Sequence, residues 1–303
     1  MRFDLASIID VREKAELVKR SNLSGAVILT ANWISIFLIY FLVTIFPNVL
    51  TIAVAFILLP GRQLGLSVLM HECAHKTLFK SDWCNNFFGH WFCALPVFND
   101  LHKYRDEHMI HHRGVGTSED PDLGNYESYP IEFASFRRKV LRDLTGRTGM
   151  RSLGAILFFK KELETSSSKR TYRPLLRIIV SQFSLLLIFA NLGAGWFYLI
   201  WVAVFMTTFM LVIRVRQVAE HGGVPDLYDP NPLKNTRTVD APWWQRFLLA
   251  PNWVNFHMEH HLMPGVPCYR LRSFRQKLKK SGVLNEVPNF LGYGQLIEHV
   301  VVT

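Results

Sequence analysis

Two long stretches without a charged side chain constrain the fold of this chain more than any other feature of its sequence. Residues 21–61 and 178–213 contain no Asp, Glu, Lys or Arg over 41 and 36 residues. A helix needs about 20 apolar residues to cross a bilayer, so each stretch has room for two crossings. Turn signals interrupt both, at Pro47 and Asn48 in the first and at "NLGAG" in the second. The sequence therefore predicts two helical hairpins, with helices over about 24–46, 48–69, 175–191 and 196–213.

The distribution of charge predicts how these hairpins are oriented. Every Lys and Arg lies in residues 1–20, 62–177 or 214–303, and neither hairpin turn carries a charge. Because Lys and Arg accumulate on the cytoplasmic side of membranes, we expect both termini and both long charged segments in the cytoplasm. The long apolar stretches argue against a soluble nucleic-acid-binding protein, even though the net charge of the chain is +10. Arg62, at the end of the second helix, is expected to extend its side chain toward the cytoplasmic surface.

These segments predict one all-α membrane domain over residues 1–303. Four transmembrane helices in two hairpins would support a cytoplasmic helical cap. The apolar segment 85–98 is too short to cross and predicts an interfacial or re-entrant helix, while "TSSSK" at 165–169 predicts a loop. The expected parts are an N-terminal cytoplasmic segment (1–20), the first hairpin (21–70), a cytoplasmic or interfacial segment (71–174), the second hairpin (175–213) and a C-terminal cytoplasmic segment (214–303).

Eight of the twelve histidines fall into three short clusters, "HECAH", "HMIHH" and "HMEHH". On a helix, residues i, i+3 and i+4 lie on one side, so each cluster presents two or three imidazoles together. All three lie in segments expected on the cytoplasmic side, and a ninth histidine follows the fourth helix in "RQVAEH". The candidate metal ligands are His71, His75, His108, His111, His112, His221, His257, His260 and His261.

Nine imidazoles are too many for one metal ion. A catalytic zinc takes three protein ligands, whereas two metals with four or five histidines each would use the whole set. Imidazole binds iron, zinc, copper and nickel, so ligand type leaves the metal open. Ligating histidines also need acceptors for their second ring nitrogen. The candidate acceptors are Glu72, Asp106, Glu107, Glu119, Asp120, Asp122, Glu220 and Glu259, and His90, His102 and His299 are expected outside the centre.

The first cluster also has an alternative interpretation. "HECAH" matches the zinc-protease motif His-Glu-x-x-His, in which Glu72 would act as the base. That hypothesis requires one zinc ion and gives the later clusters no role. A metal transporter or a metal-binding protein without catalysis is a further alternative, but it calls for ligands at mid-membrane depth. The predicted helices contain no histidine there.

Around the clusters, the sequence resembles the integral-membrane fatty acid desaturases, which carry three histidine boxes. "HECAHKTLF" resembles the first box, "YRDEHMIHHRGVGTSEDPD" the second and "NFHMEHHLMPGVPCYRL" the third, while "RQVAEH" resembles an additional ligand segment. The resemblance extends over roughly residues 25–275. It implies a di-iron centre held by the nine histidines, which would activate O2 with two electrons from a redox partner and remove hydrogen from an acyl chain. Where some family members have an asparagine near one iron, this chain has Gln217.

Two further features narrow what the resemblance implies. No haem-binding cytochrome b5 motif is present, so electrons are expected from a separate ferredoxin-type or cytochrome b5-like donor. The first box is similar to those of acyl-lipid and bacterial members, which implies a lipid-linked or carrier-linked acyl substrate and a bacterial inner membrane. Hydroxylation, ketolation or oxidative decarboxylation on the same scaffold is the nearest alternative reaction. Trp83, Trp91, Trp243, Trp244 and Trp253 are candidates to line an acyl channel, with anchoring at the membrane interface as the alternative.

Overall fold

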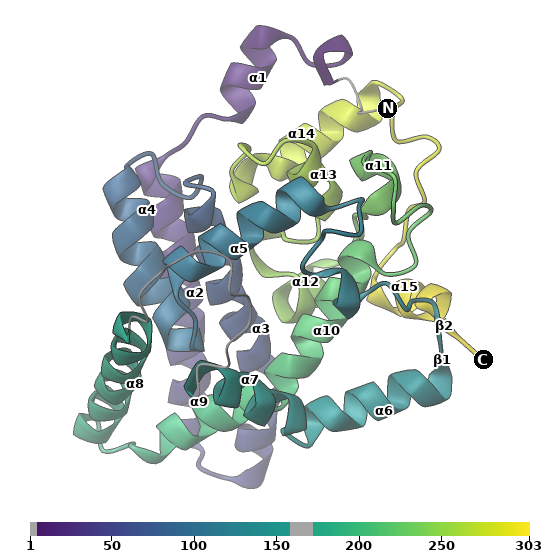
Figure 1. Ribbon diagram of the computed structural model, residues 1–303. Coiled ribbons are helices and arrows are strands. Elements are labelled where there is room, and N and C mark those ends of the chain that lie inside the picture. The colour runs from purple at the N-terminus through teal and green to yellow at the C-terminus, as the bar shows by residue number, and fades with distance from the viewer. Residues whose placement is uncertain (1–4, 158–171) are drawn as a thin grey trace.

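The computed structural model describes residues 5–157 and 172–303, and the expected loop at 165–169 lies outside them. The regular structure of the described chain is almost entirely helical, as the sequence predicts (Figure 1). Its only strands are β1 (Ile131–Glu132) and β2 (Val301–Val302), which pair in parallel. The helices outside the membrane segments are α1 (Val11–Leu17), α4 (Asp82–Phe88), α5 (Leu101–Gly114), α6 (Phe133–Leu144), α7 (Arg147–Leu157), α11 (Pro232–Asn235), α12 (Trp243–Leu249), α13 (His257–Leu262), α14 (Cys268–Lys280) and α15 (Tyr293–Val300), with short 3-10 turns η1 (Leu5–Ser7), η3 (Leu95–Val97), η4 (Leu123–Asn125) and η5 (Pro251–Trp253).

Within the described residues, four helical segments are long and apolar enough to cross a membrane. The first hairpin consists of α2 (Asn22–Ile45) and α3 (Val49–Ala74), and the second of α8 (Arg173–Asn191) followed by α9 (Trp196–Met206) and α10 (Thr208–His221). The turn of the first hairpin forms because the Asn48 side chain accepts hydrogen bonds from the backbone of Leu50 and Thr51 and so caps α3. The two predicted hairpins are therefore present, with ends displaced by a few residues.

Two of these helices continue beyond the apolar stretches that predicted them. Helix α3 ends at Ala74 rather than near residue 69, and the last span reaches His221 after a break at Thr207. Thr207 has φ −119° and ψ −91°, outside the helical region, and separates α9 from α10. Because α3 and α10 extend this far, they carry His71 and His221 on regular helix and place His75 at the C-cap of α3.

The structure contradicts the expectation for Arg62. Its guanidinium is buried rather than directed to the surface, and its Nη2 donates a hydrogen bond to the carbonyl oxygen of Phe247. The guanidinium carbon also lies 3.9 Å from the centroid of the Phe247 ring. Phe247 belongs to the last turn of α12, where exposed carbonyls carry partial negative charge. The cation is therefore stabilised inside the protein by a helix end and an aromatic face.

The apolar segment 85–98 is helical and packs against α3. It comprises most of α4, a π-helical turn η2 (Gly89–Ala94) and η3. A β-carbon at Gly89 would lie 2.4 Å from the β-carbon of Cys73, so this position has no room for a side chain. The close approach lets the segment cover the part of α3 that ends in the first histidine cluster.

Helices α5, α11, α13 and α14 gather over the end of the bundle where α3 and α10 finish (Figure 1). There α5 contacts α3, and α13 contacts both α11 and α14. Farther along α10, Arg214 forms an ion pair with Asp143 of α6, whose side chain is fully buried. This arrangement brings segments separated by more than a hundred residues to one end of the membrane helices.

Candidate metal centre

The nine candidate histidines come from four separate elements and converge at the end of the bundle. His71 lies in the last turn of α3, His75 caps that helix, and His221 is the last residue of α10. The second cluster lies on α5 and the third on α13. Their ring nitrogens form two groups, in each of which one nitrogen per residue lies within 4.8 Å of all the others. The five-histidine group is His71, His75, His108, His112 and His260, and the four-histidine group is His111, His221, His257 and His261.

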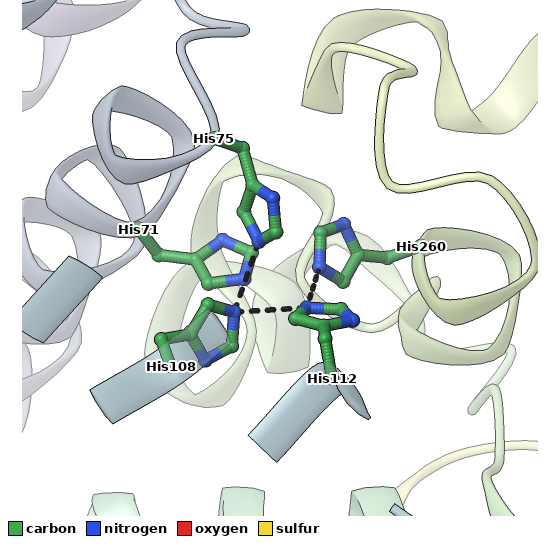
Figure 2. A group of neighbouring side chains, drawn as sticks. All are labelled: His71, His75, His108, His112 and His260. Carbon is green, nitrogen blue, oxygen red and sulfur yellow. Dashed lines mark hydrogen bonds between the residues drawn. The ribbon is translucent and has the colours of Figure 1, made fainter. Parts of the chain in front are cut away.

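In the five-histidine group, the Nε2 atoms face one another (Figure 2). Nε2 of His108 lies 2.9 Å from Nε2 of His75 and 3.0 Å from Nε2 of His112. Nε2 of His112 also lies 3.0 Å from Nε2 of His260. Nε2 of His71 is buried and has no hydrogen-bond partner.

These contacts fit a bound metal ion better than they fit hydrogen bonds. A ring nitrogen has one in-plane site, which holds either a proton or a lone pair, so a nitrogen with two nitrogen neighbours makes at best shared, bent hydrogen bonds. Ligand nitrogens at about 2.1 Å from a zinc-sized ion and at right angles to each other are about 3.0 Å apart. The observed separations and the unpartnered nitrogen of His71 therefore match a set of lone pairs directed at one cation.

The four-histidine group adjoins the first. Nε2 of His257 lies 2.9 Å from Nε2 of His221, and Nε2 of His261 is buried without a partner. The rings of His261 and His112, one from each group, are stacked with 4.4 Å between their centroids. The same metal-fit argument applies here, and it gives two neighbouring metal positions.

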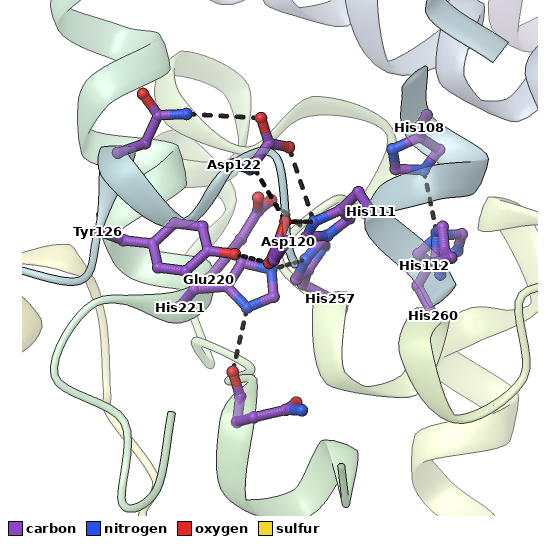
Figure 3. Close-up of polar contacts among 12 residues, drawn as sticks. His108, His111, His112, Asp120, Asp122, Tyr126, Glu220, His221, His257 and His260 are labelled. Atoms are coloured by element: carbon purple, nitrogen blue, oxygen red, sulfur yellow. Dashed lines mark hydrogen bonds and ion pairs between the residues drawn. The ribbon is translucent and has the colours of Figure 1, made fainter. Parts of the chain in front are cut away.

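The remote ring nitrogens of three residues in the four-histidine group lie near oxygen atoms (Figure 3). Nδ1 of His111 lies 2.8 Å from Oδ1 of Asp120, and Nδ1 of His221 lies 3.0 Å from the carbonyl oxygen of Asn235. Nδ1 of His257 lies 3.5 Å from Oε1 of Glu220. Acceptors at 2.8 and 3.0 Å fix the tautomer and the orientation of His111 and His221, whereas Glu220 lies beside His257 as a nearby charge.

Three of the predicted outer carboxylates lie beside these rings, and others do not. Asp120, Asp122 and Glu220 approach the four-histidine group, and Asp120 and Asp122 form a further possible ligand set with His111. Asp106, Glu107 and Glu119 are exposed. Glu259 bonds Arg275 and Thr238 instead of a histidine. Sequence reasoning missed Tyr126, Asn235, Thr238 and Arg275, because nothing near them in the sequence indicates their distant partners.

The remaining predicted positions lie outside the centre. His102 and His299 are exposed, and His90 is buried in η2 beside His102, with 5.5 Å between the ring centroids. Of the five tryptophans, Trp83 and Trp243 are 65% and 74% exposed. Trp91 and Trp244 are also exposed, so these four side chains fit anchoring at an interface better than lining a channel.

Burial lowers the pKa values of six candidate ligands that lie outside the membrane helices. It lowers the pKa of His75 to about 4, with a smaller contribution from Arg105, and that of His112 to about 2, with smaller contributions from neighbouring imidazoles. The pKa values of His108, His257, His260 and His261 are also well below the usual value, for the same two reasons. These imidazoles are therefore neutral near pH 7, the state in which their lone pairs can bind a metal.

We expect the metal-free protein to lose stability as the pH falls below about 6.5. In that pH range the histidines of the unfolded chain are protonated, whereas the buried rings of the folded protein stay neutral. The free energy of unfolding therefore decreases as the pH falls toward the folded pKa of about 4 for His75. Thermal unfolding in detergent, followed by circular dichroism between about pH 7.5 and pH 5, measures this without titrating most carboxylates. A melting temperature that stays constant over this range would contradict the expectation.

Comparison with known proteins agrees with this geometry. A model of the fatty acid desaturase family matches residues 46–286. The chain is 29% identical to dihydrorhizobitoxine desaturase of Bradyrhizobium elkanii over 244 residues, which cover 74% of this chain and 66% of that protein. It is 27% identical to an sn-1 oleoyl-lipid 12-desaturase of Picosynechococcus sp., with 80% and 73% covered, and 24% identical to a beta-carotene ketolase of Paracoccus sp., with 87% and 96% covered. The chain thus spans about two thirds of the length of the first of these relatives.

Proposed function

This chain belongs to the fatty acid desaturase family, as its histidine boxes predicted, and we propose that it is an O2-dependent desaturase of acyl chains in a membrane. The observation that carries the proposal is the convergence of nine histidines in neighbouring groups of five and four. We propose that they hold two iron ions. The four apolar helices and the oleoyl-lipid desaturase among the relatives support an integral membrane protein.

The proposed reaction removes two hydrogens from adjacent carbons and forms a C=C bond, while O2 takes up these hydrogens together with two electrons and two protons to give two waters. Bound iron would supply the activation of O2. The protein would keep His75, His108, His112, His257, His260 and His261 neutral by burial, and orient His111 through Asp120 and His221 through the carbonyl oxygen of Asn235. Electrons would come from a separate ferredoxin-type or cytochrome b5-like protein.

We further propose that both termini and the histidine groups face the cytoplasm, in a bacterial inner membrane. The absence of Lys and Arg from both hairpin turns supports this orientation. The histidine groups lie where α3 and α10 leave the apolar bundle, so a lipid-linked or carrier-linked acyl chain could reach them from the membrane. The sn-1 oleoyl-lipid 12-desaturase among the relatives supports a lipid-linked substrate.

A second candidate function is oxygenation of a lipid on the same scaffold. The similarity to the beta-carotene ketolase, which covers 96% of that protein's length, supports this candidate specifically. Both reactions begin with loss of a hydrogen from an unactivated carbon, and they differ in whether a second hydrogen leaves or oxygen is added.

Lipid profiling distinguishes the two reactions. Membranes from cells with and without the expressed protein would be compared by mass spectrometry, with an inactive His108→Ala variant as the control. We expect acyl chains that have lost two hydrogens. Products that have gained oxygen instead would reject desaturation and support the oxygenase, and no new product from lipids or carotenoids would reject both.

Glu72→Gln is expected to retain the metals and most of the activity. Oε2 of Glu72 accepts hydrogen bonds from Oγ1 of Thr77 at 2.7 Å and from the Cys268 backbone at 2.9 Å. A glutamine oxygen can accept both bonds. Oε1 lies 3.7 Å from Nδ1 of His71, beyond hydrogen-bond distance. Metal analysis and product formation would be compared with His71→Ala, which should lose both, whereas loss of turnover with metal retained would support the role of a base that the protease motif assigns to Glu72.

A further inference from the structure

The two histidine groups differ in the carboxylates that lie near the Nδ1 atoms of their rings. In the four-histidine group, Asp120 lies 2.8 Å from His111 and Glu220 lies 3.5 Å from His257, measured from carboxylate oxygen to Nδ1. A third carboxylate, Asp122, lies 3.7 Å from Nδ1 of His111. Three carboxylates therefore surround two of the four rings.

Both close carboxylates are held in position by other groups. Asp120 is 6% exposed and accepts hydrogen bonds from the Tyr126 hydroxyl and from the Asp122 backbone. Glu220 is also 6% exposed and forms an ion pair with Arg216, with 2.6 Å between Oε1 and Nε. Both carboxylates are thus placed before a metal binds, and they outnumber the single nearby guanidinium.

The five-histidine group lacks such support. Across residues 5–157 and 172–303, no hydrogen bond joins a ring nitrogen of this group to a carboxylate. The nearest carboxylate is Glu72, at 3.7 Å from His71, and its hydrogen bonds go to Thr77 and Cys268. Nδ1 of His260 is buried without any partner.

We infer that the two metal positions are not equivalent: the four-histidine position binds a divalent cation first and more tightly. The residues responsible are Asp120, which positions His111, and Glu220, whose carboxylate lies beside His257. The fifth imidazole of the other group adds a ligand, but all five ligands are neutral. A buried dication without nearby negative charge is costly, whereas the carboxylates around His111 and His257 offset its charge and raise the basicity of their rings. This inference rests on the proposed dimetal centre.

Titration of the full-length, metal-stripped protein with Zn²⁺ in detergent tests the order of binding. Calorimetry against a competing chelator should resolve two binding steps that differ at least about tenfold in affinity. Asp120→Asn and Glu220→Gln should each weaken the tighter step about 10- to 100-fold and leave the weaker step unchanged. His260→Ala should remove only the weaker step, and Glu72→Gln is the matched carboxylate control, which should alter neither step.

Tyr126→Phe provides a milder variant in case the carboxylate substitutions prevent folding. It removes only the hydroxyl that holds Asp120, so a smaller weakening of the tighter step is expected. The inference would be overturned if the unaltered protein bound both zinc ions with equal affinity. It would also be overturned if the Asp120 and Glu220 substitutions weakened the lower-affinity step instead of the higher-affinity step. Two bound zinc ions without this order would leave the proposed function intact, whereas failure to bind two ions would count against the dimetal centre itself.

Discussion

Replacing His108 by alanine is expected to remove the metal from the five-histidine group and to lower product formation by more than about 100-fold. His108 is central to this group, because its Nε2 lies within 3.0 Å of Nε2 of both His75 and His112. Loss of a residue that only supports a ligand already costs 10- to 100-fold in comparable sites, and here the ligand itself is removed. Metal content per chain and product yield would be measured on the same purified sample.

His102→Ala is the matched control for this substitution. It removes an imidazole from the same helix, α5, but from an exposed position outside both groups. The control should retain both metals and full activity. Equal loss of metal in the two variants would mean that α5 tolerates no substitution, and unaltered metal content in His108→Ala would contradict the assignment of His108 as a ligand.

Replacing Arg275 by methionine is expected to destabilise the protein by about 3–5 kcal/mol. Nη1 of Arg275 lies 2.6 Å from Oε1 of Glu259, a fully buried carboxylate within the third histidine cluster. Nη2 also lies 3.1 Å from Asp240. Without the guanidinium, Glu259 would keep only its bond to Thr238, and an uncompensated charge would lie beside the ligands of α13. Thermal unfolding in detergent and metal content would both be measured.

Two controls separate the ion pair from general damage to α14. Arg272→Met removes an exposed cation from the same helix and should change the melting temperature little. The double variant Glu259→Leu with Arg275→Met removes both charges and should recover part of the lost stability. A double variant no more stable than Arg275→Met would indicate that the guanidinium acts through its contact with Asp240 instead.

Much of the fold follows from local sequence. Long uncharged stretches broken at Pro47 and at residues 191–195 predicted two hairpins, and the structure has them. Helix ends were less accurate, because Ala74 and His221 end helices that continue into polar sequence, where hydropathy gives no signal. Arg62 was misjudged for a related reason: its partner, the Phe247 carbonyl, is 185 residues away along the chain.

The histidine clusters show the same limit at the site. The spacing predicted two metal positions with four or five histidines each, but the rings of one cluster do not all serve one position. On α5, the i and i+4 residues His108 and His112 belong to the five-histidine group, and the i+3 residue His111 to the other. On α13 the division is reversed: the i and i+4 residues join the four-histidine group and His260 the five-histidine group.

The sequence by itself determined the membrane helices and the nine candidate ligands, because hydropathy and helical spacing are local properties. An i+3 side chain points about 100° away from its i+4 neighbour, so each cluster can serve two directions. Which direction meets which cluster depends on how α3, α5, α10 and α13 pack, and only the tertiary structure decided that. The tertiary structure also decided which oxygen atoms contact the remote ring nitrogens. The carbonyl oxygen of Asn235, for example, meets Nδ1 of His221 because the intervening loop turns back, and no local sequence pattern predicts that contact.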